Sequence, residues 1–358
     1  MGNIRVGLIA NASAARDVRR LTSLARTIDV HERVNTVARV LRGLAGAGVA
    51  TILHMPEPAH VVERAVDALA AAGFPLDRDD GPQLEAVALP NGGEALDAAG
   101  TAAAAGAMAR AGAACLVTIG GDGTNRAVAQ GWPAAVIVAL PGGTNNAFGT
   151  PIDPTAAGLI AGLYAADAES MAVHVRRSPL LRVTVAGRAE GTTIALVDVV
   201  LTRSAWVGAH ALWDPALLVE AVVARSDPAV TGLAGLGGML RPLDPEPVRA
   251  LHVRFDPACP TVTVPLGPGQ LVPVGIRDWR VVELGEVVEL GLPPAGTTFR
   301  GGDGVLTVAF DGERELVLPS GSGVRVWLTA DGPRVLDAHA ALHEAASRGA
   351  FTKRWSAR

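Results

Sequence analysis

Lysine is nearly absent from this chain. Among 358 residues, Lys353 is the only lysine, whereas arginine is abundant. A Walker-type loop needs a lysine that reaches the β- and γ-phosphates, so no glycine-rich loop of this sequence can be of that kind. Any phosphate charge must instead be met by backbone amides, arginine or a metal ion.

Cysteine, surplus positive charge and long apolar runs are also scarce. The two cysteines, Cys115 and Cys259, cannot form a disulfide framework, which fits a reducing cytoplasm. The net charge is -4, so the chain lacks the positive surplus that is typical of a general nucleic-acid binder. No uncharged apolar run reaches the roughly 20 residues of a membrane span, and the first residues lack a secretory pattern. We therefore expect a cytoplasmic protein whose partner is a small molecule or a protein, with no nucleic acid and no membrane.

Two further kinds of site lack support in the sequence. His339 and His343 share a predicted helix but have no third ligand, so a structural zinc site is not expected. No serine lies in the G-x-S-x-G pattern of acyl hydrolases. The remaining candidates for a functional site are the glycine-rich loops.

Strands and helices alternate along the first 150 residues. The predicted strands span 4–10, 49–55, 84–89, 115–119 and 135–140. Helical patterns lie between most of them, and this alternation is typical of a doubly wound parallel sheet. We expect a Rossmann-like α/β nucleotide-binding domain over residues 1–150.

Beyond residue 150, short strands are separated by glycine and proline. This pattern predicts a mainly antiparallel, β-sandwich-like substrate domain over 151–334. One helix is expected within it at 216–224, because Asp214 and Pro215 form a helix-start signal. The glycine-rich segment 232–238 is expected to be flexible. A C-terminal helix should return to the first domain, so that residues 335–358 belong with it.

Two of the predicted strands run into glycine-rich polar loops. The strand at 115–119 is followed by G-G-D-G-T-N, and the strand at 135–140 by P-G-G-T-N-N. In open α/β sheets ligands bind at the carboxyl ends of the strands, so both loops should border one site. The candidate binding residues of the loops are Gly120, Gly121, Gly123, Thr124, Asn125, Gly142, Gly143, Thr144, Asn145 and Asn146. Threonine and asparagine are also common caps and turn residues, which is the alternative for these side chains.

Asp122 is the carboxylate within these loops. The glycine amides can cradle phosphate oxygens, and a helix starting near Asn125 would add a favourable dipole. A carboxylate among those donors would repel phosphate unless it held a metal ion or accepted a proton from the attacking hydroxyl, and phosphoryl transfer requires both tasks. We therefore expect Asp122 to be catalytic, as a base or as a metal ligand. The alternative is a tight turn closed by an Asx hydrogen bond.

The ordered pair of loops resembles the shared signature of the NAD kinase and diacylglycerol/sphingosine kinase superfamily. The letters that carry this resemblance are G-G-D-G-T at 120–124 and P-G-G-T-N at 141–145. The letters G-L-I-A-N-A-S at 7–13 and V-G-A-H-A-L-W at 207–213 are similar to a narrower branch, the NAD kinase-like X proteins of acetoin-catabolism operons. The resemblance spans most of the chain and implies that both loops line a nucleotide site.

The resemblance also implies roles for residues outside the loops. Asn11 and Ser13 fall where the superfamily has a nucleotide-contacting loop. Asp198 matches the acid of an asparagine-acid pair that holds the dinucleotide in NAD kinases, while Val197 stands in place of the asparagine. Glu313, in a D-G-E segment, is similar to the acid that assists the acceptor hydroxyl in lipid kinases. From the residues alone, Asp198 could instead be a solvent-facing strand residue, and the D-G letters are a hairpin-turn signal.

The function implied by this resemblance is an ATP-dependent kinase with Mg²⁺ that phosphorylates a hydroxyl, with NAD as the leading acceptor and NADP biosynthesis as its setting. Val197 motivates an alternative, a nucleotide- or NAD(P)-binding regulatory protein with little catalysis. A lipid kinase acting on diacylglycerol- or sphingosine-like substrates is a third reading, although the chain shows no basic amphipathic helix for a membrane surface. The sequence leaves the oligomeric state open, with a homo-oligomer among the alternatives.

Overall fold

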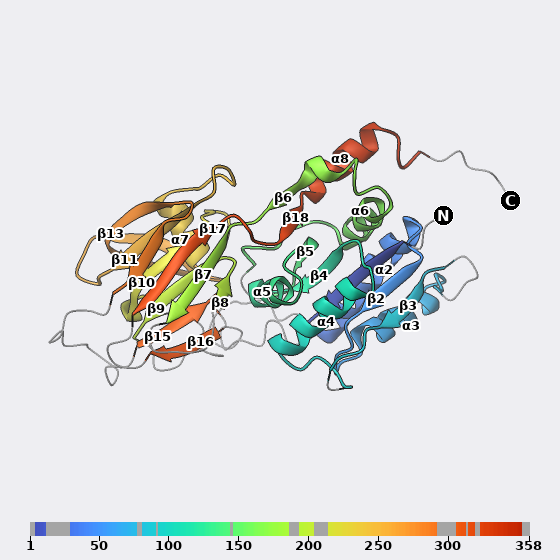
Figure 1. Cartoon of the computed structure of the whole chain (residues 1–358), viewed down its shortest axis with the longest axis horizontal. Helices are drawn as coiled ribbons and strands as arrows, with labels where there is room; N and C mark the ends of the chain where they lie inside the picture. Colours follow the sequence, from blue (N-terminus) through green and yellow to red (C-terminus); the bar gives the residue numbers. More distant parts are fainter. Residues whose placement is uncertain are drawn as a thin grey trace.

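The computed structural model shows two bodies packed side by side along the long axis of the molecule (Figure 1). It describes residues 4–11, 29–76, 81–90, 92–143, 146–185, 193–203, 214–291, 306–312, 314–318 and 323–352. The first body contains a mainly parallel sheet between helices, and the second contains two antiparallel sheets.

The sheet of the first body has the strand order β3-β2-β1-β4-β5-β18-β6. Its strands are β1 (Arg5–Ala10), β2 (Thr51–His54), β3 (Gln83–Ala86), β4 (Leu116–Gly120), β5 (Val136–Pro141), β6 (Val175–Arg177) and β18 (Arg334–Leu336). β1 to β5 and β18 run parallel, and the edge strand β6 is antiparallel to β18. The predicted parallel sheet is confirmed.

Helices cover both faces of this sheet, as the doubly wound prediction requires. One face is covered by α2 (Val30–Gly46), α3 (Val61–Ala71), α6 (Pro154–Ala166) and α8 (Ala338–Ser347), and the other by α4 (Ala98–Arg110) and α5 (Asp122–Gly131). Side chains of β1 alternate between the two layers, with Leu8 in the first core and Ile9 in the second. Because α6 and β6 pack with this sheet, the first body extends past the boundary predicted at residue 150.

The second body is a sandwich of two antiparallel sheets. The larger sheet has the order β12-β13-β11-β10-β9-β15-β16, and the smaller has the order β14-β17-β7-β8. The strands are β7 (Leu180–Val185), β8 (Thr193–Ala195), β9 (Asp198–Thr202), β10 (Leu218–Val223), β11 (Arg249–Phe255), β12 (Thr261–Gly267), β13 (Gln270–Glu283), β14 (Val287–Leu290), β15 (Leu306–Phe310), β16 (Arg314–Leu318) and β17 (Val324–Thr329). Val308 and Val326 share the core between the sheets, and α7 (Leu233–Leu240) covers the outer face of the larger sheet. The predicted antiparallel sandwich is confirmed.

The helix predicted at 216–224 is wrong. One 3-10 turn, η3 (Pro215–Leu217), forms at the predicted start, where the Asp214 carboxylate accepts a backbone N–H, and the chain then continues as β10. Val222 faces the core of the sandwich, whereas Val223 faces α7. β-Branched side chains buried alternately on two faces stabilise a strand, and this pairing overrides the local helix-start signal.

Segment 232–238, expected to be flexible, instead forms most of helix α7. Its leucines, Leu233 and Leu236, are buried against the larger sheet. A Cβ on Gly238 would lie 2.1 Å from the backbone nitrogen of Pro228, so this glycine permits a close approach of the helix to the preceding chain. The glycine pattern therefore reflects tight packing rather than freedom of the chain.

The C-terminal segment returns to the first body, as predicted. β18 pairs with β5, and α8 packs on α6 with Ala341 in the first core. At the junction between the bodies, Leu196 and Val197 share a core with Val128 of α5. This contact brings the connection between β8 and β9 close to the helix that carries Asp122.

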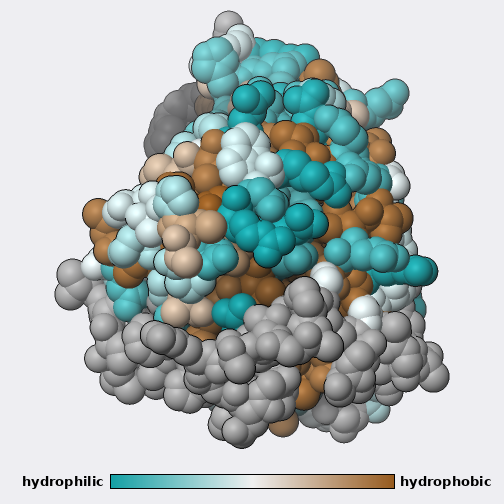
Figure 2. Space-filling view, turned by 90° about the vertical axis from the view of Figure 1, so that its left-hand side faces the viewer, coloured by the Kyte–Doolittle hydropathy of each residue, from teal (hydrophilic) through white to brown (hydrophobic). Residues whose placement is uncertain are grey.

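No helix within the described ranges is both long enough and apolar enough to cross a membrane. Seen from the outer end of the second body, polar and apolar residues are intermixed over the described part of the surface (Figure 2). Exposed apolar side chains include Leu271 and Trp279, both on β13. The surface in this view therefore shows no single continuous apolar face among the described residues.

Candidate functional site

The first glycine loop joins β4 to α5. β4 ends at Gly120 and α5 begins at Asp122, three residues before the start predicted near Asn125. Asp122 therefore lies in the first turn, where the helix dipole favours a negative charge. Gly121 occupies the N-cap position and supplies no side-chain cap. A helix start of this kind is suited to binding an anion.

The second glycine loop packs directly on the first. The Gly142 N–H donates to the Gly120 carbonyl at 2.9 Å. A Cβ on Gly142 would lie 2.7 Å from the Gly120 nitrogen, and a Cβ on Gly143 would lie 2.7 Å from the Gly121 Cα. Side chains at these positions would push the two backbones apart. The two loops thus lie together at the carboxyl ends of their strands.

Asp122 ties the two loops together. Its Oδ1 accepts the Phe148 N–H at 2.9 Å, and its Oδ2 accepts the Ala147 N–H at 3.1 Å. Asp122 is 5% exposed, and burial raises its pKa to about 7, an effect that the Phe148 N–H opposes and the nearby Asp311 carboxylate reinforces. A carboxylate with this pKa can hold and release a proton near neutral pH, which is what a general base must do.

The polar side chains of the first loop bond to neighbouring protein groups. Asn11, at the end of β1, donates from Nδ2 to Thr124 Oγ1 at 2.9 Å. The fully buried Asn125 accepts from Thr118 Oγ1 at 2.7 Å and donates to the Gly121 carbonyl at 3.1 Å. These bonds hold the loop in shape, and ligand contacts by the three predicted residues stay a prediction.

Asn146 closes the second loop on itself. Its Oδ1 accepts the Gly143 N–H at 2.8 Å, and its Nδ2 donates to the Gly143 carbonyl at 2.7 Å. This pair of bonds gives Asn146 a structural task in addition to the predicted ligand contact. The predicted site residues Ser13, Thr144, Asn145 and Glu313 lie outside the described residues.

Two further buried carboxylates are coupled electrostatically to Asp122. Asp198, at the start of β9, and Asp311, after the end of β15, are each 6% exposed. Burial raises the pKa of Asp198 well above its usual range, the carboxylates of Asp311 and Asp122 raise it further, and Arg126 lowers it. Burial also raises the pKa of Asp311. Asp198 is therefore a buried carboxylate rather than a solvent-facing strand residue.

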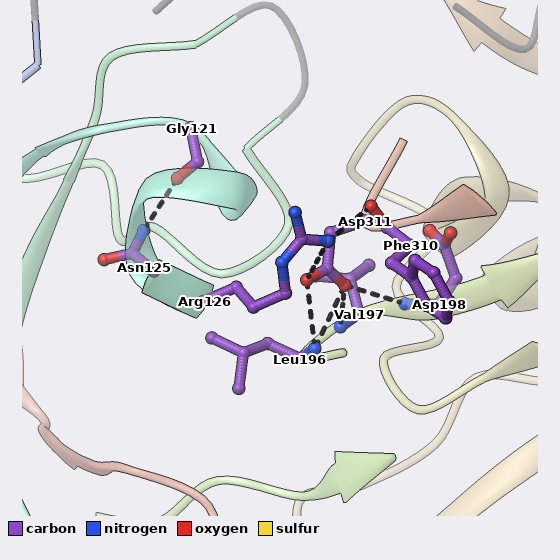
Figure 3. A network of polar contacts seen from close by, with 8 residues as sticks. All are labelled: Gly121, Asn125, Arg126, Leu196, Val197, Asp198, Phe310 and Asp311. Atoms are coloured by element: carbon purple, nitrogen blue, oxygen red, sulfur yellow. Dashed lines mark hydrogen bonds and ion pairs between the residues drawn. The ribbon is translucent and has the colours of Figure 1, made fainter. Parts of the chain in front are cut away.

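Arg126 lies next to the Asp311 carboxylate (Figure 3). It is 3% exposed, its Nη1 donates to the Phe310 carbonyl at 2.7 Å, and the same atom lies 3.5 Å from Oδ2 of Asp311. The guanidinium thus reaches from α5 to the turn after β15 and connects the two bodies.

Arg225, which follows β10, is a second cation at this junction. Its guanidinium carbon lies 4.4 Å from the centre of the Phe148 ring, and its Nη2 donates to Ser178 Oγ at 2.9 Å. Burial lowers the pKa of Arg225, whereas the carboxylates of Asp122 and Asp311 raise it. Because Phe148 also donates its N–H to Asp122, the guanidinium is held on the second loop beside that carboxylate.

Comparison with known proteins identifies the family. The acetoin catabolism protein X of Cupriavidus necator is 33% identical over 350 residues, which cover 95% of this chain and 92% of that protein. The chain belongs to the acetoin catabolism protein X family. A family model described as the acetoin catabolism protein X C-terminal domain matches residues 179–331, which run from β7 to the end of β17. The part of the family that this model describes is therefore the β-sandwich, including Asp198 and Asp311.

Three solved structures are also similar to this member of the family. Yeast NADH kinase complexed with NADH is 11% identical, with 99% of this chain and 89% of that chain covered and a TM-score of 0.48. A putative diacylglycerol kinase from Bacillus anthracis is 11% identical, with coverage of 93% and 97% and a TM-score of 0.45. An NAD kinase from Archaeoglobus fulgidus in complex with ATP is 12% identical, with coverage of 85% and 99% and a TM-score of 0.37.

Three residues of the site are missed by sequence reasoning. From the sequence, Asp311 is identified only as part of a turn, because Asp-Gly is a common hairpin signal. Arg126 follows Asp122 by four positions, and this helical spacing is the signal that could have found it. Arg225 follows a segment predicted to be helical, and no local pattern marks it.

The carboxylates of the candidate site differ in how well they suit a magnesium ion. Within the described ranges, no three His, Cys, Asp or Glu side chains are grouped to hold a metal ion. Both oxygens of Asp122 already accept backbone N–H groups, whereas Asp198 Oδ1 is buried without a hydrogen-bond partner among the described residues. Mg²⁺ is usually bound by one or two carboxylates together with substrate phosphates. Asp198 therefore fits such an ion better than Asp122, the ligand predicted from sequence.

Proposed function

We propose that this protein is a phosphotransferase that moves a phosphoryl group from ATP to a hydroxyl of a nucleotide acceptor, with NAD as the leading candidate. The observation that carries the proposal is the position of Asp122. This buried carboxylate has a pKa of about 7 and lies in the first turn of α5, where two glycine loops meet. The resemblance of both loops to the kinase superfamily signature supports the same assignment.

The donor phosphates would bind at the two loops and at the start of α5. Backbone N–H groups at a helix start and in glycine loops bind phosphate oxygens without a lysine. Arg225 would supply the positive charge that these lysine-free loops lack. Its Nε is buried and has no hydrogen-bond partner among the described residues, so it can donate to a phosphoryl oxygen.

Asp122 would act as the general base. As the acceptor oxygen forms its bond to the γ-phosphorus, the hydroxyl proton moves to the Asp122 carboxylate, and the bond from phosphorus to the bridging oxygen breaks to leave ADP. Asp198 would accept a hydrogen bond from the acceptor or hold Mg²⁺ through its unpartnered Oδ1. Bound magnesium would neutralise part of the phosphate charge.

A coupled assay of NADP formation from NAD, ATP and Mg²⁺ tests the proposal. Asp122→Asn should lower kcat by roughly 100-fold or more, the usual contribution of a positioned general base. Asp97→Asn makes the same chemical change at an exposed carboxylate that caps α4, and it should leave the rate unchanged. Full activity of Asp122→Asn would refute the mechanism.

A regulatory protein that binds nucleotides without turnover is the second candidate. The observation that favours it is the engagement of both Asp122 oxygens by backbone N–H groups, a purely structural arrangement. Calorimetry with NAD, NADP and ATP, run beside the coupled assay, separates the two functions. Tight binding with no product would favour the regulatory protein.

A further inference from the structure

The turn after β15 contacts the start of β9. Its residues Asp311 (φ 50°) and Gly312 (φ 70°) have left-handed backbone conformations, which aspartate and glycine adopt more readily than most residues. The Asp311 N–H donates to the Asp198 carbonyl at 3.0 Å. The turn is therefore fixed to the strand that begins with Asp198.

The Asp311 carboxylate holds the connection between β8 and β9 (Figure 3). It accepts hydrogen bonds from the N–H groups of Leu196 at 3.0 Å, Val197 at 2.8 Å and Asp198 at 3.3 Å. The Asp311 side chain is fully buried. Because three consecutive N–H groups converge on one anion, a single side chain sets the backbone of all three residues.

Arg126 joins this turn to the helix that carries Asp122. Its Nη1 bonds to the Phe310 carbonyl and lies 3.5 Å from Asp311 Oδ2. Arg126 follows Asp122 by four positions, so both side chains lie on the same side of α5. Asp122 is thereby linked to the start of β9 through Arg126 and Asp311, two side chains from different bodies.

This network fixes the backbone of Asp198 and leaves one side-chain oxygen uncommitted. The N–H and the carbonyl of Asp198 both bond to Asp311, whereas its Oδ1 has no partner among the described residues. A buried ion pair such as that of Arg126 and Asp311 adds little stability, because taking both charges out of water offsets their attraction. At this place the pair connects the turn that holds the start of β9 to the helix that carries Asp122.

We propose that Asp311 and Arg126 are positioning residues that fix the start of β9, and with it the Asp198 carboxylate, relative to the helix that carries Asp122. The inference rests on the proposed function, in which Asp122 and Asp198 act on the reacting groups. Asp311 and Arg126 act through Asp198 and do not contact the ligand themselves.

Hydrogen exchange tests this positioning without any assay of activity. Asp311→Asn offers one acceptor oxygen and an NH₂ group to three backbone N–H groups, so the amides of 196–198 should exchange about tenfold faster or more than in the wild type. Asp337→Asn removes a carboxylate that accepts one N–H at the start of α8, and as the matched control it should leave this exchange unchanged. Wild-type exchange of 196–198 in Asp311→Asn would overturn the proposal.

Kinetic measurements test the consequence for catalysis. Asp311→Asn and Arg126→Met should each lower kcat by about 100-fold with little change in KM for ATP, because a displacement of about 1 Å in a reacting group costs that much. Arg126→Lys keeps the charge but not the planar fork, so it should restore part of the rate lost in Arg126→Met. The acidic limb of the pH-rate profile should move to lower pH in Asp311→Asn, because the Asp311 carboxylate raises the pKa of Asp122.

The outcomes separate this proposal from the proposed function. If the wild type transfers no phosphoryl group to any acceptor, the proposed function fails, and the exchange rates still decide whether Asp311 holds 196–198. If the wild type is active and Asp311→Asn keeps its full kcat, the positioning role fails while the function stands. The positioning role also fails if three results coincide. These are a rate loss in each variant no larger than its loss of folded protein, an unmoved acidic limb of the pH-rate profile in Asp311→Asn, and no recovery of the rate in Arg126→Lys.

Discussion

Asp122→Asn should stabilise the folded protein relative to the wild type as the pH rises, even though it removes the proposed base. Burial raises the pKa of Asp122 from 3.8 to about 7. Between these values the folded state keeps a proton that the unfolded state has released, so the wild-type free energy of unfolding falls as pH rises through this window. Asparagine does not ionise, so the variant escapes this loss.

The size of the effect follows from the two pKa values. One pKa unit corresponds to about 1.4 kcal/mol, so the difference in proton binding between the two states lowers the wild-type free energy of unfolding by roughly 4 kcal/mol at pH 8 and by about 2 kcal/mol at pH 5. Asparagine keeps one acceptor oxygen but turns its NH₂ toward the N–H of Ala147 or Phe148, which costs about 1 to 3 kcal/mol at every pH. Between pH 5 and pH 8 the free energy of unfolding of the variant should therefore rise by roughly 2.5 kcal/mol relative to that of the wild type, and this change does not depend on the cost of the substitution itself.

Urea unfolding at pH 5, 6, 7 and 8, followed by tryptophan fluorescence, measures this change. Asp167→Asn is the matched control, because hydrogen bonds from Ser170 lower the pKa of the exposed Asp167 carboxyl. That carboxyl is ionised in both states throughout this range, so the control should differ from the wild type by the same amount at each pH. A constant difference between Asp122→Asn and the wild type would refute the raised pKa.

Three further predictions follow from the same contacts. Gly142→Ala should destabilise the protein by about 1 to 3 kcal/mol in thermal unfolding, because the new methyl would lie 2.7 Å from backbone; Gly46→Ala, with nothing within 4 Å, should stabilise it by about 0.5 kcal/mol. Arg225→Gln should move the acidic limb of the pH-rate profile to higher pH, because this cation lowers the pKa of Asp122; an unmoved limb would contradict their proximity. Cys115, fully buried with a pKa raised to about 12, should resist iodoacetamide in the native protein and react after denaturation, as mass spectrometry can show.

Local sequence pattern is enough to predict the architecture and the edge of the sheet at which the candidate site lies. The apolar runs that became β4 and β5 are bounded by glycine, and their helical neighbours follow a regular period, so both can be predicted from local pattern. Parallel strands joined through helices end at one edge of the sheet, and for this reason the loops at 120–125 and 141–146 could be expected to meet. The C-terminal helix could likewise be predicted from a local helical pattern.

Which other side chains join the candidate site depends on the tertiary structure. β10 formed in place of a helix because alternate residues found two different cores, which no local signal records. Asp311 and Arg225 reached Asp122 through packing between segments far apart in the chain. The pKa of about 7 likewise depends on burial and on the carboxylate of Asp311, which lies far away in the sequence. Propensity and spacing act between near neighbours, whereas desolvation and charge coupling depend on what the whole fold brings together.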